Sequence, residues 1–383
     1  MSYPSLTEEQ ELMRNAARDF AQTEGMAAYM AQVQAGKYPM DFGYGLWPRL
    51  AELNFIGIAT PEKMGGLGMD VTTQLLVMEE LSVIPAVGTN IDAHDLALHT
   101  IEFNGSEYQK EKYGIPAAKG QIICAAAVTD PAGSMNFPEW SITVEETKGG
   151  YILNGTKLFC SSSIAADLYA VYTKDYENGY PMGCFLVEKD TEGLQYGHLE
   201  EFGKTGTNTG TVVLKNVFVP KENKIPSGDL ANAAWLGLGY LDCSAVLIAW
   251  AQGALTKTID YVKTRTRNGK PLASLQAVAH RIANMDMQLE QARLVMYTAA
   301  AYWDAGKPNP KLNSMAKIAS SEALTKISHD CCVLHGAYGM APETGLIQIH
   351  AAAPSGHVGE CPNDFHRDLI ARELGIALDS HLA

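Results

Sequence analysis

The sequence contains no run of about 18 or more uninterrupted apolar residues, and no basic stretch followed by an apolar one stands at its start. These absences argue against a membrane span and a secretory leader, so we expect a cytoplasmic protein. The seven cysteines are scattered and form no CxxC pair, which argues against a zinc site or a dithiol centre. We expect them to be buried core thiols, and we expect no metal site.

Basic residues are also scarce: 29 lysines and arginines stand against 43 aspartates and glutamates, a formal net charge of −14. An acidic balance disfavours nucleic acid and anionic membranes as partners. With 46% apolar residues, 8% aromatics and no low-complexity tract, the chain is neither disordered nor disulfide-dense. A chain of 383 residues with this composition predicts a globular protein of two or three packed domains.

Helical patterns fill the first part of the chain, up to about residue 114. LTEEQELMRNAARDF has Thr7 as a predicted N-cap and Gln10 three residues later, which together form a capping box. Further helices are predicted at 47–54, 71–84 and 91–104.

From about residue 120 to 226, at least six β-rich runs are separated by Gly, Asn, Asp and Pro, which predicts an antiparallel sandwich or barrel. Helical periodicity then returns after Asp229, and KPNP at 307–310 separates two long helices. The predicted fold is α+β, with an N-terminal helical domain at 1–118, a central antiparallel β domain at 119–228 and a C-terminal helical bundle at 229–383. This order disfavours a doubly wound nucleotide-binding fold, which alternates strands and helices.

Several segments together give the chain a resemblance to a known family. They are LTEEQELMRNAARDF, LAELNFIGIATPEKMGGLGMD, VTDPAGS, LNGTKLFCSSS, RTRNGKPLASLQAVAHRIANM and VLHGAYGM. In this order, and over nearly the whole length, the chain resembles the acyl-CoA dehydrogenases. The resemblance implies a C-terminal four-helix bundle, an FAD cofactor, a homotetramer, and an electron-transferring flavoprotein or similar electron acceptor.

Two segments of the β domain match the family's flavin site. A flavin ring needs backbone and hydroxyl donors at its polar edge and a flat apolar neighbour. In VTDPAGS, Val128 and Thr129 match the contacts to the pyrimidine edge, and Ser134 matches the contact to the pyrophosphate. In LNGTKLFCSSS, Phe159 matches the aromatic residue against the ring, and Ser161 matches the hydroxyl partner of N5. Taken singly, each fragment is also typical of an ordinary hairpin or an amphipathic strand.

Three positions of the C-terminal part match contacts to the dinucleotide. Arg265 matches an arginine that reaches the cofactor of a neighbouring subunit, and Gln276 matches a second contact of that kind. Gly336 lies in the family's glycine loop near the adenosine, where glycine lets the backbone approach phosphate. An isolated arginine at a helix end would more simply be solvated.

The resemblance implies Glu360 as the catalytic base, by alignment backward from DLIAR at 368–372. Removal of a proton from the α-carbon of a thioester, while a hydride leaves the β-carbon, calls for a desolvated carboxylate. In some family members the base lies instead on the helix that begins the C-terminal domain. The corresponding residue here is Gly239, with Asp242 close by in sequence.

A second group of polar residues lies in NIDAHDLALH, where Asp92, His94 and Asp95 match the far end of the family's acyl pocket. Some members that act on cyclic acyl-CoAs use an aspartate from this region, so Asp92 is a second catalytic candidate. Burying these groups against methylenes would be costly, so we expect a short or cyclic acyl group. Solvated helix-end residues are the simpler alternative.

The expected function is therefore FAD-dependent α,β-dehydrogenation of an acyl-CoA thioester with a short or cyclic, hydroaromatic acyl group. Glu360 would remove the proton, and the hydride would pass to flavin N5. The alternatives are 1,4-dehydrogenation of a cyclic enoyl-CoA through Asp92, enoyl-CoA reduction on the same scaffold, and a non-catalytic flavoprotein subunit.

Overall fold

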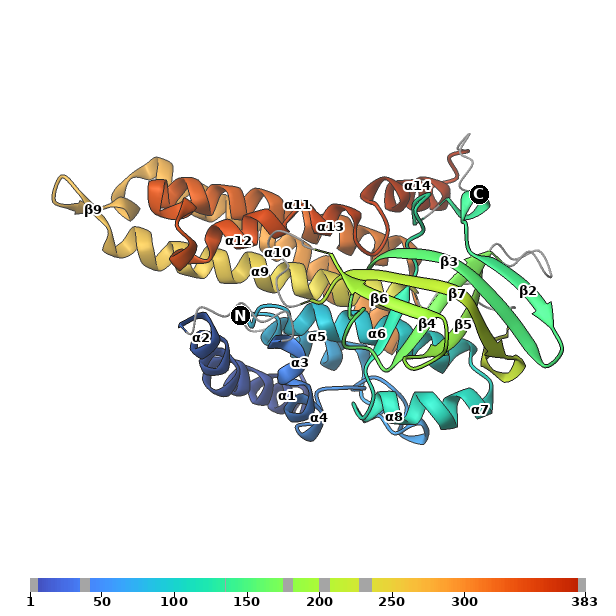
Figure 1. Cartoon of the computed structure of the whole chain (residues 1–383). Helices are drawn as coiled ribbons and strands as arrows, with labels where there is room; N and C mark the ends of the chain where they lie inside the picture. The colour runs from blue at the N-terminus through green and yellow to red at the C-terminus, as the bar shows by residue number, and fades with distance from the viewer. Residues whose placement is uncertain are drawn as a thin grey trace.

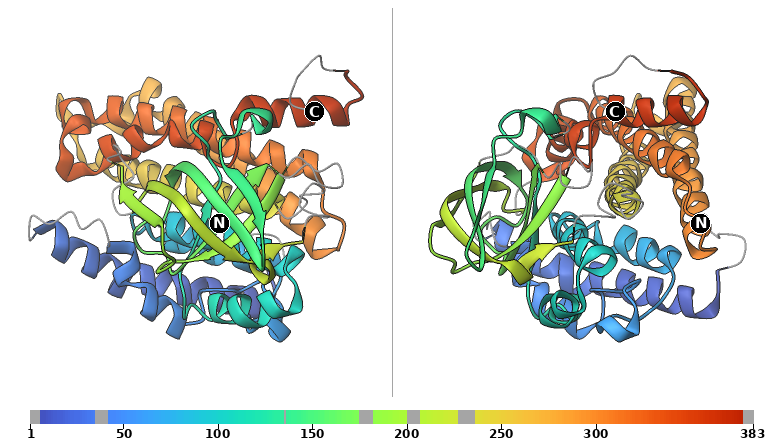
Figure 2. Two further views of the ribbon diagram at one scale, coloured as in Figure 1. Left: turned by 45° about the vertical axis from the view of Figure 1, so that its right-hand side comes forward. Right: turned by 90° about the vertical axis from the view of Figure 1, so that its right-hand side faces the viewer.

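Three blocks of secondary structure follow one another in the computed structural model, which describes residues 6–34, 42–134, 136–174, 182–199, 207–226 and 236–377. Short helices come first, two β-sheets follow, and long helices complete the chain (Figure 1). Seen along the long helices, the sheets lie on one side, with the N-terminal helices below and the C-terminal helices above (Figure 2). The predicted α+β class is confirmed. The predicted boundary at 118/119 falls directly after a helix, and the one at 228/229 lies outside the described residues.

The N-terminal block contains eight helices in the described residues: α1 (Glu8–Phe20), α2 (Met26–Gln34), α3 (Phe42–Gly45), α4 (Trp47–Glu52), α5 (Val71–Leu81), α6 (Val87–Asn104), α7 (Glu107–Gln109) and α8 (Ile115–Ala118). The predicted capping box is present, because the Thr7 hydroxyl accepts from the Gln10 N–H at 3.2 Å and Gln10 Oε1 accepts from the Thr7 N–H at 3.0 Å. Helix α6 begins four residues earlier than predicted. Its first turn, VGTN, has little apolar pattern, but Gly88 packs tightly against Ser82 and Val246.

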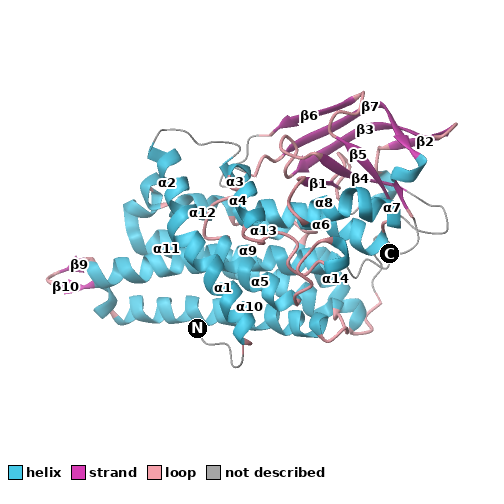
Figure 3. Ribbon diagram, turned by 90° about the horizontal axis from the view of Figure 1, so that it is seen from below, coloured by secondary structure: helices cyan, strands magenta, loops and turns pink. Residues whose placement is uncertain are grey.

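The β domain consists of two four-stranded sheets. One has the order β1 (Cys124–Ala127), β4 (Leu168–Lys174), β5 (Met182–Glu188) and β8 (Lys224–Ile225). The other has the order β2 (Thr143–Thr147), β3 (Gly150–Cys160), β7 (Gly210–Pro220) and β6 (Leu194–His198). A shared core that includes Tyr169, Phe185, Leu153 and Val212 joins the two sheets, which gather at one corner of the molecule (Figure 3).

One strand pairing differs from the expected antiparallel arrangement. β1 pairs with β4 in parallel, with Cys124 opposite Leu168. Parallel neighbours need a long crossover connection, and the chain supplies it by building β2 and β3 of the other sheet between them. The remaining pairings of both sheets are antiparallel.

The C-terminal block is built on three long helices, α9 (Leu236–Thr264), α10 (Gln276–Asp304) and α11 (Pro310–His335). Three shorter helices, α12 (Leu346–Ala352), α13 (Ser355–Val358) and α14 (Asn363–Glu373), pack against α11. The KPNP segment ends α10 and supplies Asn309, whose side chain caps α11 by accepting from the Leu312 N–H. A two-stranded hairpin of β9 (Thr266–Arg267) and β10 (Lys270–Pro271) projects from the far end of the bundle (Figure 1).

Helix α9 forms the centre of the molecule. Among the described residues it is the one helix whose length and composition would allow it to cross a membrane, but 78% of its most apolar window is buried inside the fold. The core therefore accounts for its composition. Six of the seven cysteines are buried, as predicted for core thiols, and Cys361 is partly exposed.

Candidate active site

The loop between α13 and α14 carries Glu360, the predicted base. Glu360 and Cys361 have backbone φ angles of +45° and +70°, in the left-handed region that residues with a Cβ avoid. For a residue with a Cβ, this conformation costs on the order of 1–3 kcal/mol of folding free energy, and it persists only where the surrounding structure imposes it. The loop is therefore held in a strained conformation at the residue of interest.

Buried polar side chains impose this conformation. His366 Nε2 donates to the Glu360 carbonyl oxygen at 2.8 Å, and Lys317 Nζ donates to the Cys361 carbonyl oxygen at 2.7 Å. Lys317 also donates to Asn363 Oδ1 at 2.9 Å, on the first turn of α14. Burial lowers the pKa of His366 to about 4, so the neutral imidazole is the donor. The backbone is thus fixed at and directly after Glu360.

The Glu360 carboxylate lies against the first turn of α9. Its Oε2 atom is 3.1 Å from the position that a Cβ would take at Gly239, and Leu96 Cδ1 from α6 is 3.4 Å from the same point. A side chain at residue 239 would compete for this space, so glycine there leaves it to Glu360. Burial raises the pKa values of Tyr240 and Tyr172, and the Glu360 charge adds to both shifts. The carboxylate therefore lies where α6, α9 and strand β4 meet.

Asp242, one helical turn beyond Gly239, is directed toward a different partner. Gln74 Nε2 from α5 donates to both of its oxygens, at 2.9 and 3.1 Å. Burial raises the pKa of Asp242 to about 7, and Glu360 adds to the shift. Burial, together with Asp242, raises the pKa of Asp95 on α6 well above its usual range. Since Gln74 holds Asp242 toward α5, these contacts favour Glu360 over Asp242 as the base.

Asp92 lies on the face of α6 that packs against α9. Four residues before it, a Cβ at Gly88 would lie 3.1 Å from Val246 of α9, and four residues after it, Leu96 reaches the space above Gly239. Asp92 is 9% exposed, so it is not a solvated helix-end residue. It therefore borders the same helix interface as Glu360.

His94, in contrast, is directed toward the β domain. Its Nε2 donates to the Ala117 carbonyl oxygen at 3.1 Å, and its Nδ1 accepts from the Cys124 N–H at 3.0 Å. Burial lowers its pKa to about 3, which keeps the ring neutral. The imidazole joins α6 to α8 and β1, which is a structural role.

The two segments predicted to hold a flavin lie side by side. The Leu158 N–H donates to the Thr129 carbonyl oxygen at 2.8 Å, which joins the VTDPAGS loop to the end of β3. The pairing of β3 with β7 shifts register between Lys157 and Cys160, and within this irregularity Phe159 adopts a φ of +52°. Its ring is 57% exposed beside Ser161, as a surface for a flat ligand requires.

The VTDPAGS loop, Phe159 and Ser161 are together called the cradle. A buried lysine anchors the loop of this cradle. Lys157 Nζ donates to the Val128 carbonyl oxygen at 2.8 Å, lies 3.6 Å from Asp130 Oδ2, and lies 3.8 Å from the centre of the Trp140 ring. Asp130 in turn accepts from the Ser141 N–H at 2.9 Å. Burial lowers the pKa of Lys157 to about 8. The VTDPAGS loop is therefore anchored by a buried ion pair that the sequence analysis did not identify.

The segment that follows β6 adds a further polar group. The backbone N–H groups of Ser162 and Ser163 donate to the carbonyl oxygens of Thr207 and Asn208, both at 3.1 Å. Asn208 is 3% exposed, and its Oδ1 has no hydrogen-bond partner in the described part of the chain. An orphaned buried acceptor in a segment bonded to the residues that follow Ser161 fits a site for a ligand with N–H donors. Ser134, at the end of the VTDPAGS loop, is partly exposed. Its neighbour Met135 lies outside the described residues.

The three remaining predicted cofactor residues lie at the other end of the bundle. Arg265 directly follows α9, Gln276 begins α10, and both are exposed. Gly336 follows α11 with φ +62° and ψ −135°, a conformation available to glycine, and the preceding His335 ring stacks on Tyr261 of α9 at 4.0 Å. The length of α9 separates this end from Gly239 by about 40 Å. One copy of the chain therefore does not bring these residues to its own cradle.

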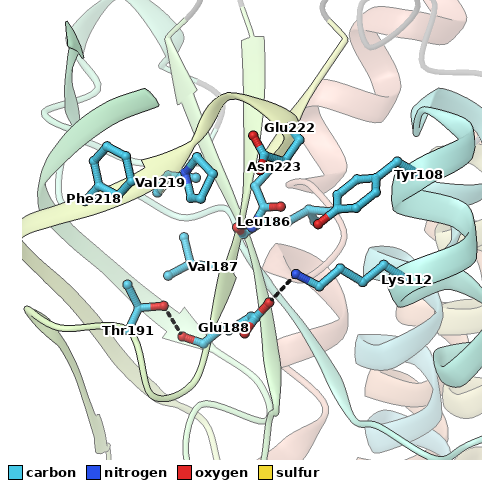
Figure 4. A pocket seen from close by; sticks show the side chains of 11 residues that line it. Tyr108, Lys112, Leu186, Val187, Glu188, Thr191, Phe218, Val219, Glu222 and Asn223 are labelled. Atoms are coloured by element: carbon cyan, nitrogen blue, oxygen red, sulfur yellow. Dashed lines mark hydrogen bonds and ion pairs between the residues drawn. The ribbon is translucent and has the colours of Figure 1, made fainter. Parts of the chain in front are cut away.

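Two open cavities lie away from these residues. A notch of about 240 Å³ between α7 and the sheets is lined by Tyr108, Lys112, Glu188 and Phe218, and a second notch of about 490 Å³ shares Lys112 and Glu188 with it. Figure 4 shows the Lys112–Glu188 ion pair that spans the first notch, with Nζ and Oε1 2.9 Å apart. Neither notch includes a predicted site residue.

Comparison with known proteins accounts for this architecture. Models of the N-terminal, middle and C-terminal domains of acyl-CoA dehydrogenases match residues 7–121, 125–217 and 230–375. The chain belongs to the acyl-CoA dehydrogenase family. As a member of this family, the protein is a flavoprotein oxidoreductase that acts on CH–CH bonds.

Among its relatives, this acyl-CoA dehydrogenase is 31% identical to an acyl-CoA dehydrogenase of Bacillus subtilis, over 96% of this chain and 98% of the relative. It is 32% identical to subunit CarC of the caffeyl-CoA reductase-Etf complex of Acetobacterium woodii, over 88% and 90% of the two chains. It is 31% identical to a 3-(aryl)acrylate reductase of Clostridium sporogenes, over 96% and 99%.

Solved structures show the same fold. Butyryl-CoA dehydrogenase from Megasphaera elsdenii matches with a TM-score of 0.90 at 28% identity, over 98% of this chain and all of that one. A chain from a structure described as electron transferring flavoprotein of Acidaminococcus fermentans matches equally well, with a TM-score of 0.90 at 28% identity, over 97% and 99% of the two chains.

Several residues of this dehydrogenase's site escaped the sequence analysis. Lys157, Lys317 and His366 each stand alone among ordinary neighbours, and nothing in the local pattern distinguishes a buried lysine from a solvated one. Thr205, which stands where the family typically has arginine, lies outside the described residues.

Proposed function

We propose that the protein dehydrogenates a short or cyclic acyl-CoA thioester between Cα and Cβ, with Glu360 as the base and FAD as the hydride acceptor. The observation that carries this proposal is the place of the Glu360 carboxylate, 3.1 Å from the Cβ position of Gly239. Glycine at 239 removes the alternative base position on α9, and Glu360 fills the same space from the opposite side.

The residues of the cradle fit an FAD cofactor. Phe159 offers an exposed ring face, Thr129 and Ser161 offer hydroxyl groups beside it, and the orphaned Asn208 oxygen calls for a donor. Bound FAD would supply a hydride acceptor at N5, a chemistry that none of the protein's side chains can provide. Ser134 would contact the pyrophosphate of the same cofactor.

The protein's own part in the reaction is proton removal in a site with little water. Glu360 would accept the Cα proton, and the hydrogen bonds from His366 and Lys317 to the loop backbone would keep its carboxylate facing the substrate. Because these donors bind the backbone carbonyl oxygens of the loop, they fix the orientation of the residue that carries the base. The buried tyrosines Tyr172 and Tyr240 exclude water from its surroundings.

Assembly into a homotetramer would complete the cofactor site. Arg265, Gln276 and Gly336 gather about 40 Å from Gly239, so they would meet the FAD of a neighbouring copy. Helix α10 also exposes apolar side chains, Met287 and Leu294, at a spacing of seven residues, as a helix interface requires. An electron-transferring flavoprotein, with which relatives are associated by name, would receive the electrons in the cytoplasm.

A test of the base uses purified protein mixed anaerobically with butyryl-CoA, 3-phenylpropionyl-CoA or cyclohexanecarbonyl-CoA, with loss of flavin absorbance as the signal. We expect Glu360→Gln to retain FAD and to slow flavin reduction about 10²–10⁴-fold, the usual contribution of a general base. Asp92→Asn is the matched control and should remain active. Full turnover by Glu360→Gln would move the base elsewhere, and loss of turnover in Asp92→Asn would then favour the 1,4-dehydrogenation of a cyclic substrate.

A second variant pair uses the space above Gly239. Gly239→Glu alone should abolish reduction, because two side chains then compete for one place. Gly239→Glu combined with Glu360→Gly should restore part of the rate, because a carboxylate again occupies that space. Failure of the double variant to exceed Glu360→Gly alone would show that the space above Gly239 does not define the reacting position.

The reverse direction, enoyl-CoA reduction, is favoured by the names of two relatives, the caffeyl-CoA reductase subunit and the 3-(aryl)acrylate reductase. It is distinguished by mixing chemically reduced protein with cinnamoyl-CoA and comparing the rate of flavin oxidation with the rate of reduction by 3-phenylpropionyl-CoA. A purified protein without flavin absorbance would instead indicate a non-catalytic subunit.

A further inference from the structure

Two buried carboxyl groups near the proposed base have no part in the mechanism above. Asp242 lies three residues from Gly239 on α9, and Asp95 lies next to Leu96, which borders the Glu360 carboxylate. Both residues are at most 3% exposed, and Asp242 helps to raise the pKa of Asp95. The pair therefore belongs to the same interior as the reacting groups, about one helical turn deeper.

One atom of this pair lacks a partner. Asp95 Oδ1 accepts no hydrogen bond from any described residue, although Asp95 is only 3% exposed. It lines a cavity of about 10 Å³ together with Gln74, whose amide is bonded to Asp242. A space of this size admits about one water molecule or one hydroxyl or amine group. A buried acceptor of a residue that lines such a space calls for a donor.

The surrounding groups supply no cation. Within the described ranges, no lysine or arginine shifts the pKa of Asp95 or Asp242. Asp242 and Glu102 act on the pKa of Asp95, and Gln74 and Glu360 act on that of Asp242. The nearby His99 is kept neutral, because burial lowers its pKa to about 4. The donor therefore comes from a bound molecule, either a water or a group of a ligand.

We propose that Asp95 and Asp242 bind a hydrogen-bond donor, a hydroxyl or an amine, at the distal end of a short acyl group. This inference rests on the proposed function, because it places the thioester end of the same substrate at Glu360. The three residues from Gly239 to Asp242 correspond to about 4.5 Å of helix rise, which an acyl chain of a few bonds can span. Phe55, Met78 and Leu81 line the same small cavity as Asp95, which has room for one terminal group of an acyl chain.

The ionisation of the pair agrees with this assignment. Burial raises the pKa of Asp242 to about 7 and that of Asp95 well above its usual range, so the two carboxyls retain a proton near neutral pH. An acid pair of this kind can accept from a hydroxyl or an ammonium group without two bare charges in the core. An apolar chain would leave Asp95 Oδ1 buried without a donor, which disfavours such a chain.

The experiment compares three thioesters that differ at one terminal group: valeryl-CoA with a methyl, 4-hydroxybutyryl-CoA with a hydroxyl and 4-aminobutyryl-CoA with an ammonium. Stopped-flow reduction of the flavin in the holoenzyme gives kcat/KM for each. We expect at least one polar thioester to exceed valeryl-CoA about tenfold or more. The faster of the two polar thioesters identifies the donor as hydroxyl or amine.

The variants Asp95→Asn and Asp242→Asn keep the side-chain size, and each should reduce the polar-to-apolar ratio to about twofold or less. Asp95→Leu should reverse the preference toward valeryl-CoA. Ser244→Ala, which removes a buried hydroxyl of α9 already bonded to the Tyr240 carbonyl, is the control and should leave the ratio unchanged. Two independent aspartate variants keep the test valid if one of them fails to fold, which flavin content and circular dichroism would reveal.

Two results would overturn the inference while leaving the proposed function intact: valeryl-CoA as the fastest substrate of the unaltered protein, or a polar preference that survives both asparagine variants. Absence of flavin reduction by all three thioesters, and by the thioesters of the preceding test, would overturn the proposed function and this inference with it.

Discussion

Two buried aspartates of this protein have opposite surroundings. Asp130, under the flavin loop, lies beside the buried cation of Lys157 and accepts hydrogen bonds from Ser141. Asp95, between α6 and α9, lies beside a second carboxyl, and one of its oxygens has no partner among the described residues. Burial is nearly complete at both sites, at 1% and 3% exposure. They differ in what surrounds them.

This difference separates a carboxylate that builds the fold from one that is available to a ligand. At Asp130 the cation and the backbone donors compensate the charge within the chain, and the result is a rigid loop at Val128. At Asp95 the part of the chain that the structure describes supplies no such compensation, and burial raises the pKa. Protein interiors tolerate that cost mainly where function requires it.

The strongest way to break the comparison is to remove the cation. Lys157→Met should leave Asp130 as an uncompensated buried carboxylate, at a cost of about 3–5 kcal/mol of unfolding free energy, and should reduce FAD content. Urea denaturation and the flavin absorbance of the purified protein measure the two effects. Lys148→Met, on an exposed turn, is the control and should change stability by less than about 0.5 kcal/mol. A loss below about 1 kcal/mol for Lys157→Met would show that the ion pair does not anchor the loop.

The second prediction concerns the pH dependence of the uncompensated pair. Asp242 has a pKa of about 7 in the fold against a usual value of 3.8, so between these values the unfolded chain binds fewer protons than the native state. Stability contributed by the protonated group therefore falls as pH rises from about 4 through 7, and the penalty is complete above that. The Glu360 charge faces the same carboxyl and raises its pKa further, Gln74 opposes the shift by donating a hydrogen bond, and Asp242 in turn raises the pKa of Asp95.

Asp242→Asn stays neutral and should escape this penalty. Relative to the unaltered protein, it should gain a few kcal/mol between pH 4 and pH 8, since each pKa unit corresponds to about 1.4 kcal/mol. Denaturation curves at several pH values measure the difference. Parallel pH profiles for the two proteins would mean that Asp242 is ionised in the fold, contrary to the contrast drawn with Asp130.

The smallest effect is expected at the loop that carries the base. Cys361→Gly should stabilise the protein by about 0.5–1 kcal/mol, because glycine adopts a φ of +70° without steric cost. Cys361→Ser keeps the strain and should give no gain. Thermal unfolding measures both, and equal effects of Gly and Ser would show that strain at this residue is negligible.

Local patterns were sufficient for most of the architecture. The capping box of Thr7 and Gln10 depends on residues three apart, and the break before Pro310 depends on proline alone, so both could be predicted. The parallel pairing of β1 with β4 could not, because strand order depends on partners 44 residues apart. β6 and β8 were also missed, since LQYGH has little β pattern and β8 has two residues.

The candidate site divides in the same way. Motif order alone placed Glu360 and the flavin segments in this family, because their spacing along the chain is retained. The meeting of Glu360 with Gly239, of Asp95 with Asp242, and of Lys157 with Asp130 joins residues far apart in sequence. No local pattern states whether a carboxyl will be paired, solvated or left with a proton.

By itself, then, the sequence determined the order of helices and strands, the family, and the residue types available for proton removal and flavin binding. The tertiary structure decided which of those residues meet and in what electrostatic state. The physical reason is that periodicity and turns act over a few residues, whereas desolvation and charge pairing depend on elements that come together only when α6, α9 and the loop before α14 pack.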